Sequence, residues 1–115
     1  MPPLVSRINV VYLYVRDLDR SLAFYRDVLG IPLKKADEHW ADARLDGLRF
    51  ALHTGERVEP GTVWIDFEVD DVDAAAEQLR AAGVEVGEIN REPYGSFCDF
   101  VDPDGYRLEL FQPPS

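Results

Sequence analysis

The sequence predicts an α+β fold made of two βαβββ modules, and two observations carry this prediction. Segments rich in alternating or β-branched apolar residues flank two segments whose apolar residues recur at helical spacing. The complete order of these segments then occurs twice along the chain. We therefore expect a curled mixed sheet with the helices on its outer face.

The first module is expected to begin with a β-branched and aromatic strand at residues 8–15. Asp17 or Asp19 can cap the following helix, which should end near Leu29 because Gly30 can adopt the left-handed conformation that stops a helix. Three further strands are predicted, and a tight Asp-Gly turn joins the last two. These strands cover residues 32–36, 39–45 and 48–54.

The second module restarts with a strand at residues 63–69, where apolar and polar side chains alternate. Asp71 is expected to cap a helix that Gly83 ends. The remaining strands are predicted at residues 84–89, 96–101 and 106–112, and the turn before the last of them holds residues 102–105.

The two halves align without any rearrangement. Residues 14–19 match residues 68–73, and the helix-ending glycines match each other. A repeat in fixed order constrains every element at once, which makes it stronger than any single motif. We expect one domain at residues 1–115, with module one at about 6–54, a connector at 55–61 and module two at about 62–113.

The charge balance excludes some partners. Twenty-two acidic residues against 12 basic ones give a net charge of -10, which repels nucleic-acid phosphates and anionic membranes. No apolar run approaches the ~20 residues that cross a bilayer, and the N-terminus lacks a signal-peptide pattern. The single cysteine, Cys98, is expected to be a buried structural thiol and fits a reducing compartment. Cytoplasmic localisation is therefore predicted, with neither nucleic acid nor membrane as partner.

One face of the predicted sheet carries rings and charges together, which suits a small-molecule ligand. The residues predicted to bind it are Tyr12, Tyr14, Trp40, His53, Trp64, Asp66, Glu109 and Phe111. Asp66 and Glu109 would favour a cationic ligand, although Arg49 and Arg107 on the same face can neutralise carboxylates there. Packing of this face against another subunit, or against the other module, is the alternative explanation.

Nearly the whole chain resembles one family. The stretch from Val11 to Tyr25, VYLYVRDLDRSLAFY, resembles the opening module of the vicinal oxygen chelate superfamily. Residues 67–73, FEVDDVD, and residues 102–110, DPDGYRLEL, resemble its second module. The superfamily includes glyoxalase I, extradiol dioxygenases, fosfomycin-resistance enzymes and bleomycin-resistance proteins. The resemblance implies the same two-module fold that the repeat predicts.

The resemblance also implies where a metal would bind. Metal enzymes of the superfamily present His or Gln on the first strand of each module and Glu or a similar ligand on the last. The matching positions here are Val10, Trp64, Ala51 and Glu109. Only Glu109 can ligate, and a catalytic divalent ion needs about three protein ligands. We therefore expect no metal and no cofactor.

With three ligand positions replaced, the chain is most similar to the metal-free binding members of the superfamily. This similarity implies a homodimer that sequesters an aromatic or cationic compound such as an antibiotic. Trp64 places a flat ring where an imidazole would otherwise hold the metal.

Other functions stay open at this stage. A divalent-metal lyase, isomerase or dioxygenase would need a non-standard site, for which His53 beside Glu109 is the candidate. A metal-free enzyme would use the same two residues, or Glu109 with Tyr12, as acid and base. Whether the two modules pair within one chain or across a dimer also stays open.

Overall fold

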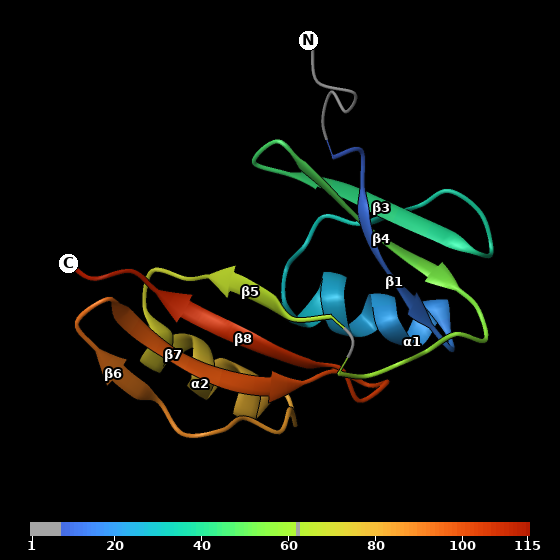
Figure 1. The fold of residues 1–115 in the computed structure, drawn as a ribbon. Helices are drawn as coiled ribbons and strands as arrows, with labels where there is room; N and C mark the ends of the chain where they lie inside the picture. The colour runs from blue at the N-terminus through green and yellow to red at the C-terminus, as the bar shows by residue number, and fades with distance from the viewer. Residues whose placement is uncertain (1–7, 62) are drawn as a thin grey trace, which may run out of the picture. The chain divides into compact units, whose positions relative to one another are not determined.

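The computed structural model describes residues 8–61 and 63–115. The chain divides into two compact units, Met1–Val58 (unit 1) and Glu59–Ser115 (unit 2). Each unit holds one four-stranded mixed sheet and one helical segment in the order βαβββ (Figure 1). The predicted α+β class and the repeated order of elements are confirmed.

Unit 1 contains a sheet with the strand order β1-β4-β3-β2, in which β1 runs parallel to β4 and the other neighbours are antiparallel. Its elements are β1 (Val11–Val15), α1 (Leu18–Leu22), η1 (Ala23–Val28), β2 (Lys34–Lys35), β3 (Trp40–Leu45) and β4 (Leu48–Thr54).

The helical segment of unit 1 begins as predicted and then changes type. The Asp17 carboxylate accepts a hydrogen bond from the Arg20 amide at 3.0 Å, which caps α1. From Ala23 the helix continues as the π-helix η1, where the Leu29 amide donates to the Phe24 carbonyl five residues earlier, at 3.0 Å. The prediction of a single α-helix is therefore wrong for the second half of this segment.

The core of unit 1 lies between its sheet and its helical segment. Leu13 and Val15 of β1 and Phe50 and Leu52 of β4 are buried, as the alternation predicts. Tyr25 of η1 is fully buried, and its ring centroid lies 5.7 Å from that of Phe50. Because these side chains point to one face, their neighbours along each strand point to the other.

Unit 2 contains a sheet with the strand order β5-β8-β7-β6, in which β5 runs parallel to β8. Its elements are β5 (Ile65–Glu68), α2 (Val72–Ala81), β6 (Asn90–Glu92), β7 (Gly95–Val101) and β8 (Arg107–Gln112).

Two predicted strands of unit 2 need correction. The strand expected at residues 84–89 is wrong: this stretch makes only an isolated bridge from Val86 to Phe100, and the edge strand β6 follows it. The strand expected to start at Val63 begins at Ile65, so Trp64 precedes it.

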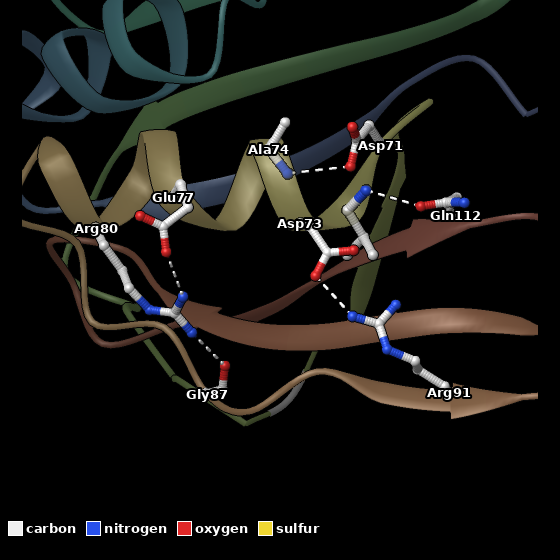
Figure 2. A network of polar contacts seen from close by, with 9 residues as sticks. Asp71, Asp73, Ala74, Glu77, Arg80, Gly87, Arg91 and Gln112 are labelled. Carbon is white, nitrogen blue, oxygen red and sulfur yellow. Dashed lines mark hydrogen bonds and ion pairs between the residues drawn. The ribbon is translucent and has the colours of Figure 1, made fainter.

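Polar contacts attach the N-terminal end of helix α2 to its sheet (Figure 2). At the N-terminus the Asp71 carboxylate accepts from the Ala74 amide at 3.1 Å, and the Gln112 side chain on β8 accepts from the first helical amide at 2.9 Å. Arg91 of β6 forms an ion pair with Asp73 at 2.6 Å. The helix therefore holds β8 and β6 in position from one face.

The side of α2 that packs on the sheet contributes Val72, Ala76 and Leu79 to the core of unit 2. They are buried together with Cys98, Phe100, Leu108 and Leu110 of the adjacent strands. Burial raises the pKa of the Cys98 thiol, as expected for a structural cysteine. No helix in the described part of the chain is long and apolar enough to cross a membrane.

Candidate functional site

Four rings meet on the face of the unit 1 sheet that lies away from its helical segment. Tyr12 and Tyr14 come from β1, Trp40 from β3 and His53 from β4. The register pairs His53 with Tyr14 on one side and with Trp40 on the other, so the three rings lie in one row across the sheet. We call these four residues the ring cluster.

His53 is the centre of the ring cluster. Its ring centroid lies 5.4 Å from that of Tyr14, 5.6 Å from that of Trp40 and 6.0 Å from that of Tyr12. The His53 Nδ1–H donates to the Thr54 carbonyl at 2.7 Å, because a carbonyl oxygen can only accept. This bond fixes the orientation of the imidazole.

The two tyrosines come from β1, and the Tyr12 ring centroid lies 5.6 Å from those of both Tyr14 and Trp40. A side-chain hydrogen bond with Tyr14 raises the pKa of the Tyr12 hydroxyl. The Tyr14 ring lies against Gly55, where an added Cβ would lie 2.6 Å from Tyr14 Cδ1. Gly55 therefore makes room for this ring.

A carboxylate and a guanidinium hold Trp40. Asp42 Oδ2 accepts from the Trp40 indole N–H at 2.9 Å and from Arg49 Nε at 2.9 Å. These bonds, with the Trp40 bond contributing most, lower the pKa of Asp42. The Arg49 guanidinium lies 5.5 Å from the Trp40 ring centroid, which is a cation–π distance.

The corresponding face of unit 2 carries a row of three carboxyl groups. Glu109 of β8 lies directly opposite Asp66 of β5 and directly opposite Asp99 of β7. Burial raises the pKa of Glu109 to about 7, and a hydrogen bond with Asp66 and the charges of both aspartates add to this effect. At neutral pH this carboxyl group can therefore either donate or accept a proton.

Aromatic side chains lie toward both ends of the unit 2 sheet, with Phe111 near the end of β8 and Trp64 before the start of β5. The Phe111 ring covers Gly95, where any added Cβ would collide with it. The Tyr94 ring is stacked on Phe97, with 6.0 Å between centroids and 18° between planes. Trp64, just before β5, has 56% of its surface exposed.

The structure thus places the eight predicted binding residues in two groups. Unit 1 brings four of them together as the ring cluster, and unit 2 places Asp66, Glu109 and Phe111 on one face of its sheet, with Trp64 just before β5. Because His53 and Glu109 belong to different units, their predicted pairing stays a prediction.

The partners of the two arginines were not identified from the sequence. Arg49 pairs with Asp42 at 2.5 Å, and Arg107 pairs with Asp99 at 3.6 Å. Asp66, Glu68 and Glu109, the carboxylates expected to be neutralised, are not among these partners. The two ion pairs occupy equivalent positions of the two modules. An alignment of the repeat can match Arg49 with Arg107, but the contacts follow only from the pairing of the strands.

The residues present do not fit the metal site of the metal enzymes. Val10 and Trp64 stand just before β1 and β5, and Ala51 lies in the buried middle of β4. None of these three side chains carries an atom that can ligate a divalent ion. Within residues 8–61 and 63–115, no group of three His, Cys, Asp or Glu side chains is arranged to hold a metal ion.

The chain is similar to several proteins of known sequence or structure. It is 36% identical to the lactoylglutathione lyase of Haemophilus influenzae, with 87% of each chain covered. It is 31% identical to the uncharacterized protein YaeR of Escherichia coli, with 94% of this chain and 97% of the relative covered. Among solved structures it matches TnmS3, an antibiotic binding protein from Streptomyces sp. CB03234, at 26% identity and a TM-score of 0.77, with 98% and 100% of the two chains covered.

A family model supports the same assignment. The model for the Glyoxalase/Bleomycin resistance protein/Dioxygenase superfamily matches residues 7–110. This match includes the first βαβββ module and all of the second except the last two residues of β8, together with the ring cluster and the carboxyl row of unit 2. The chain therefore belongs to the glyoxalase/bleomycin resistance protein/dioxygenase superfamily.

Proposed function

We propose that the protein binds a small organic molecule without a metal ion and without chemical conversion, and that the ligand is an aromatic or cationic compound such as an antibiotic. The observation that carries this proposal is the ring cluster. Its four rings lie on a sheet face away from the core, with 41% of the Tyr12 surface exposed. Flat rings at such spacing suit a flat ligand, which gains contact area at low conformational cost.

The unit 2 face supports the cationic part of the proposal. Asp66, Glu109 and Asp99 place three acidic groups in one row, and Arg107 is the only cation that pairs with them among the described residues. An excess of carboxylates favours a positively charged group. The similarity to TnmS3, which is described as antibiotic binding, is in keeping with sequestration as the biological role.

A ligand screen tests the proposal directly. We expect aromatic and cationic compounds to raise the melting temperature of the intact chain, while divalent ions alone do not. Trp40→Ala should weaken binding at least tenfold, because it removes a ring of the cluster. Leu48→Ala is the control, since Leu48 is an exposed residue of the same sheet. Stabilisation by a divalent ion with no organic ligand would contradict the proposal.

A metal-dependent lyase is the second candidate, and the 36% identity with a lactoylglutathione lyase is the observation that favours it. Such an enzyme would need ligands from outside the usual positions, for which His53 and Glu109 are the proposed residues. Purified protein should then contain about one divalent ion per chain by elemental analysis. Loss of turnover in Glu109→Gln with ligand binding intact would assign catalysis to this carboxyl group, with or without a metal.

We also propose that the chain forms a homodimer and that its ligand site involves the dimer. Light scattering coupled to size-exclusion chromatography measures the mass in solution. A mass of one chain, 13.1 kDa, at all concentrations tested would contradict this part of the proposal.

A further inference from the structure

We infer that His53 selects the ligand of the ring cluster by accepting a hydrogen bond, through Nε2, from an N–H or O–H group on the edge of an aromatic ring. The ligand class is therefore an indole-type or phenol-type compound. This inference rests on the proposed function, because it assigns chemistry to the same ring cluster.

The hydrogen bond of the other ring nitrogen leads to this assignment. Since Nδ1 donates to the Thr54 carbonyl at 2.7 Å, the neutral imidazole carries its proton on Nδ1 and a lone pair on Nε2. Among the described residues, this bond to Thr54 is the only hydrogen bond that the His53 side chain makes. Nε2 is thus an acceptor that the described residues leave unused.

The other polar groups of the ring cluster have partners within the protein. The Trp40 indole N–H donates to Asp42 at 2.9 Å, and a side-chain hydrogen bond links Tyr12 to Tyr14. Nε2 lies among three rings, and an acceptor that stays unpaired there costs binding free energy once a ligand excludes water. A ligand ring that lies against the cluster and brings its own donor removes this cost.

The repeat shows that a plain ring fits the same position. Phe111 of β8 is the equivalent of His53, since each lies two residues beyond the matched positions Ala51 and Glu109. The phenyl ring there has no acceptor. The fold of the module therefore does not require an imidazole, and His53→Phe is a substitution that keeps the ring while it removes Nε2.

Indole and N-methylindole form a matched pair of probes, because the methyl group removes the donor and leaves the flat ring. Binding to the intact chain is measured by chemical-shift titration in the millimolar range. We expect indole to bind about five- to tenfold more tightly than N-methylindole, the ratio that one net hydrogen bond supplies. The Nε2 resonance of ¹⁵N-labelled His53 should shift with indole and not with N-methylindole.

Two variants distinguish a role of His53 in ligand selection from a role in packing. His53→Phe should lose the preference for indole and retain its affinity for N-methylindole. His39→Phe is the control, since this second histidine bonds through Nδ1 to the Thr54 hydroxyl at 2.8 Å and should leave the preference unchanged.

Each other outcome counts against the inference. Equal binding of the two probes to the native chain overturns it, as does the absence of indole binding. Equal weakening of both probes in His53→Phe would show a packing role alone and also overturns it. Where both probes bind the native chain and Tyr12→Ala weakens both, the proposed binding function stands without this selectivity.

Discussion

Asp66 and Glu109 lie directly opposite each other on the parallel strands β5 and β8, and their carboxyl groups share a hydrogen bond. Two carboxyl groups in such contact resist simultaneous ionisation. The pKa of Glu109 rises to about 7 in consequence of this contact and of burial. The folded protein therefore retains a proton that the unfolded chain releases near pH 4.5.

The first prediction concerns the pH dependence of stability. Because the folded state binds this proton more tightly, the contribution of Glu109 to the free energy of unfolding is fully present below about pH 4.5. This contribution is lost as the pH rises through about 7. Glu109→Gln should remove this decrease and stabilise the protein by about 1 kcal/mol at pH 8, after allowance for partial exposure. Urea unfolding of the native chain and the variant at pH 4.5 and pH 8 measures this difference in the free energy of unfolding. Glu68→Gln on the neighbouring strand is the charge-matched control and should show a smaller change.

The second prediction concerns Asp42, whose pKa is lowered by its bonds to Trp40 and Arg49. Asp42→Asn should cost about 1–2 kcal/mol at pH 7, because it replaces charge-assisted hydrogen bonds with neutral ones. Since the contribution of a carboxyl group with a lowered pKa is lost as the pH falls through that pKa, the cost should shrink below pH 3. Unfolding by urea at pH 7 and pH 2.5 gives both values.

Asp27→Asn serves as the control for this experiment. Asp27 forms an ion pair with Arg26 at 2.9 Å, but both side chains are about half exposed. Solvent screens such an exposed pair, so we expect Asp27→Asn to change stability much less than Asp42→Asn. If the two variants lose equal stability, the Asp42 contacts do not have the role assigned to them.

The third prediction concerns Gly95, which has a φ of 148°. An added Cβ would collide with the Phe111 ring and lie 2.8 Å from the Gln112 carbonyl oxygen. Gly95→Ala should therefore cost about 2 kcal/mol or more and shift the Phe111 ring resonances. Gly87→Ala, whose Cβ would lie 3.6 Å from the nearest atom, should change stability by less than about 1 kcal/mol. Comparable losses in the two variants would argue against the close contact.

The fourth prediction concerns the start of α2. Asp71→Ala removes the side chain that accepts from the Ala74 amide at 3.1 Å, which should cost about 1 kcal/mol. Asp70→Ala, one residue earlier and exposed, should have an effect within about 0.5 kcal/mol. Thermal unfolding followed by circular dichroism measures both, and an unchanged melting temperature for Asp71→Ala would contradict the cap.

The strands that cover the core could be predicted because burial determines their pattern. Leu13 and Val15 alternate with tyrosines, and the structure buries them as expected. The edge strand β6 could not be predicted in this way. Its residues Asn90–Glu92 are all exposed, and hydrogen bonds to β7 define it. The apolar residues at 84–89 instead predicted a strand, although this stretch forms only one isolated bridge.

For the candidate site, the sequence indicated which side chains share a face but not which of them touch. Alternation alone placed Tyr14 and His53 on one face, and the register brings them opposite each other. The hydrogen bond of His53 to the Thr54 carbonyl depends on a side-chain torsion that no residue pattern encodes. The same holds for Asp42, whose role appears only when β3 is paired with β4.

The π-helix η1 corresponds to a difference in length between the helical segments of the two modules. Asp17 and Gly30 stand one position further apart than the matching Asp71 and Gly83. An extra residue in an α-helix would rotate everything after it by about 100°, whereas a π-turn absorbs it locally. Phe24 and Tyr25 both stay buried under this arrangement. The feature is what a one-residue insertion after duplication of an ancestral half would leave behind, and removal of one residue from this turn should restore an ordinary helix like that of the second half.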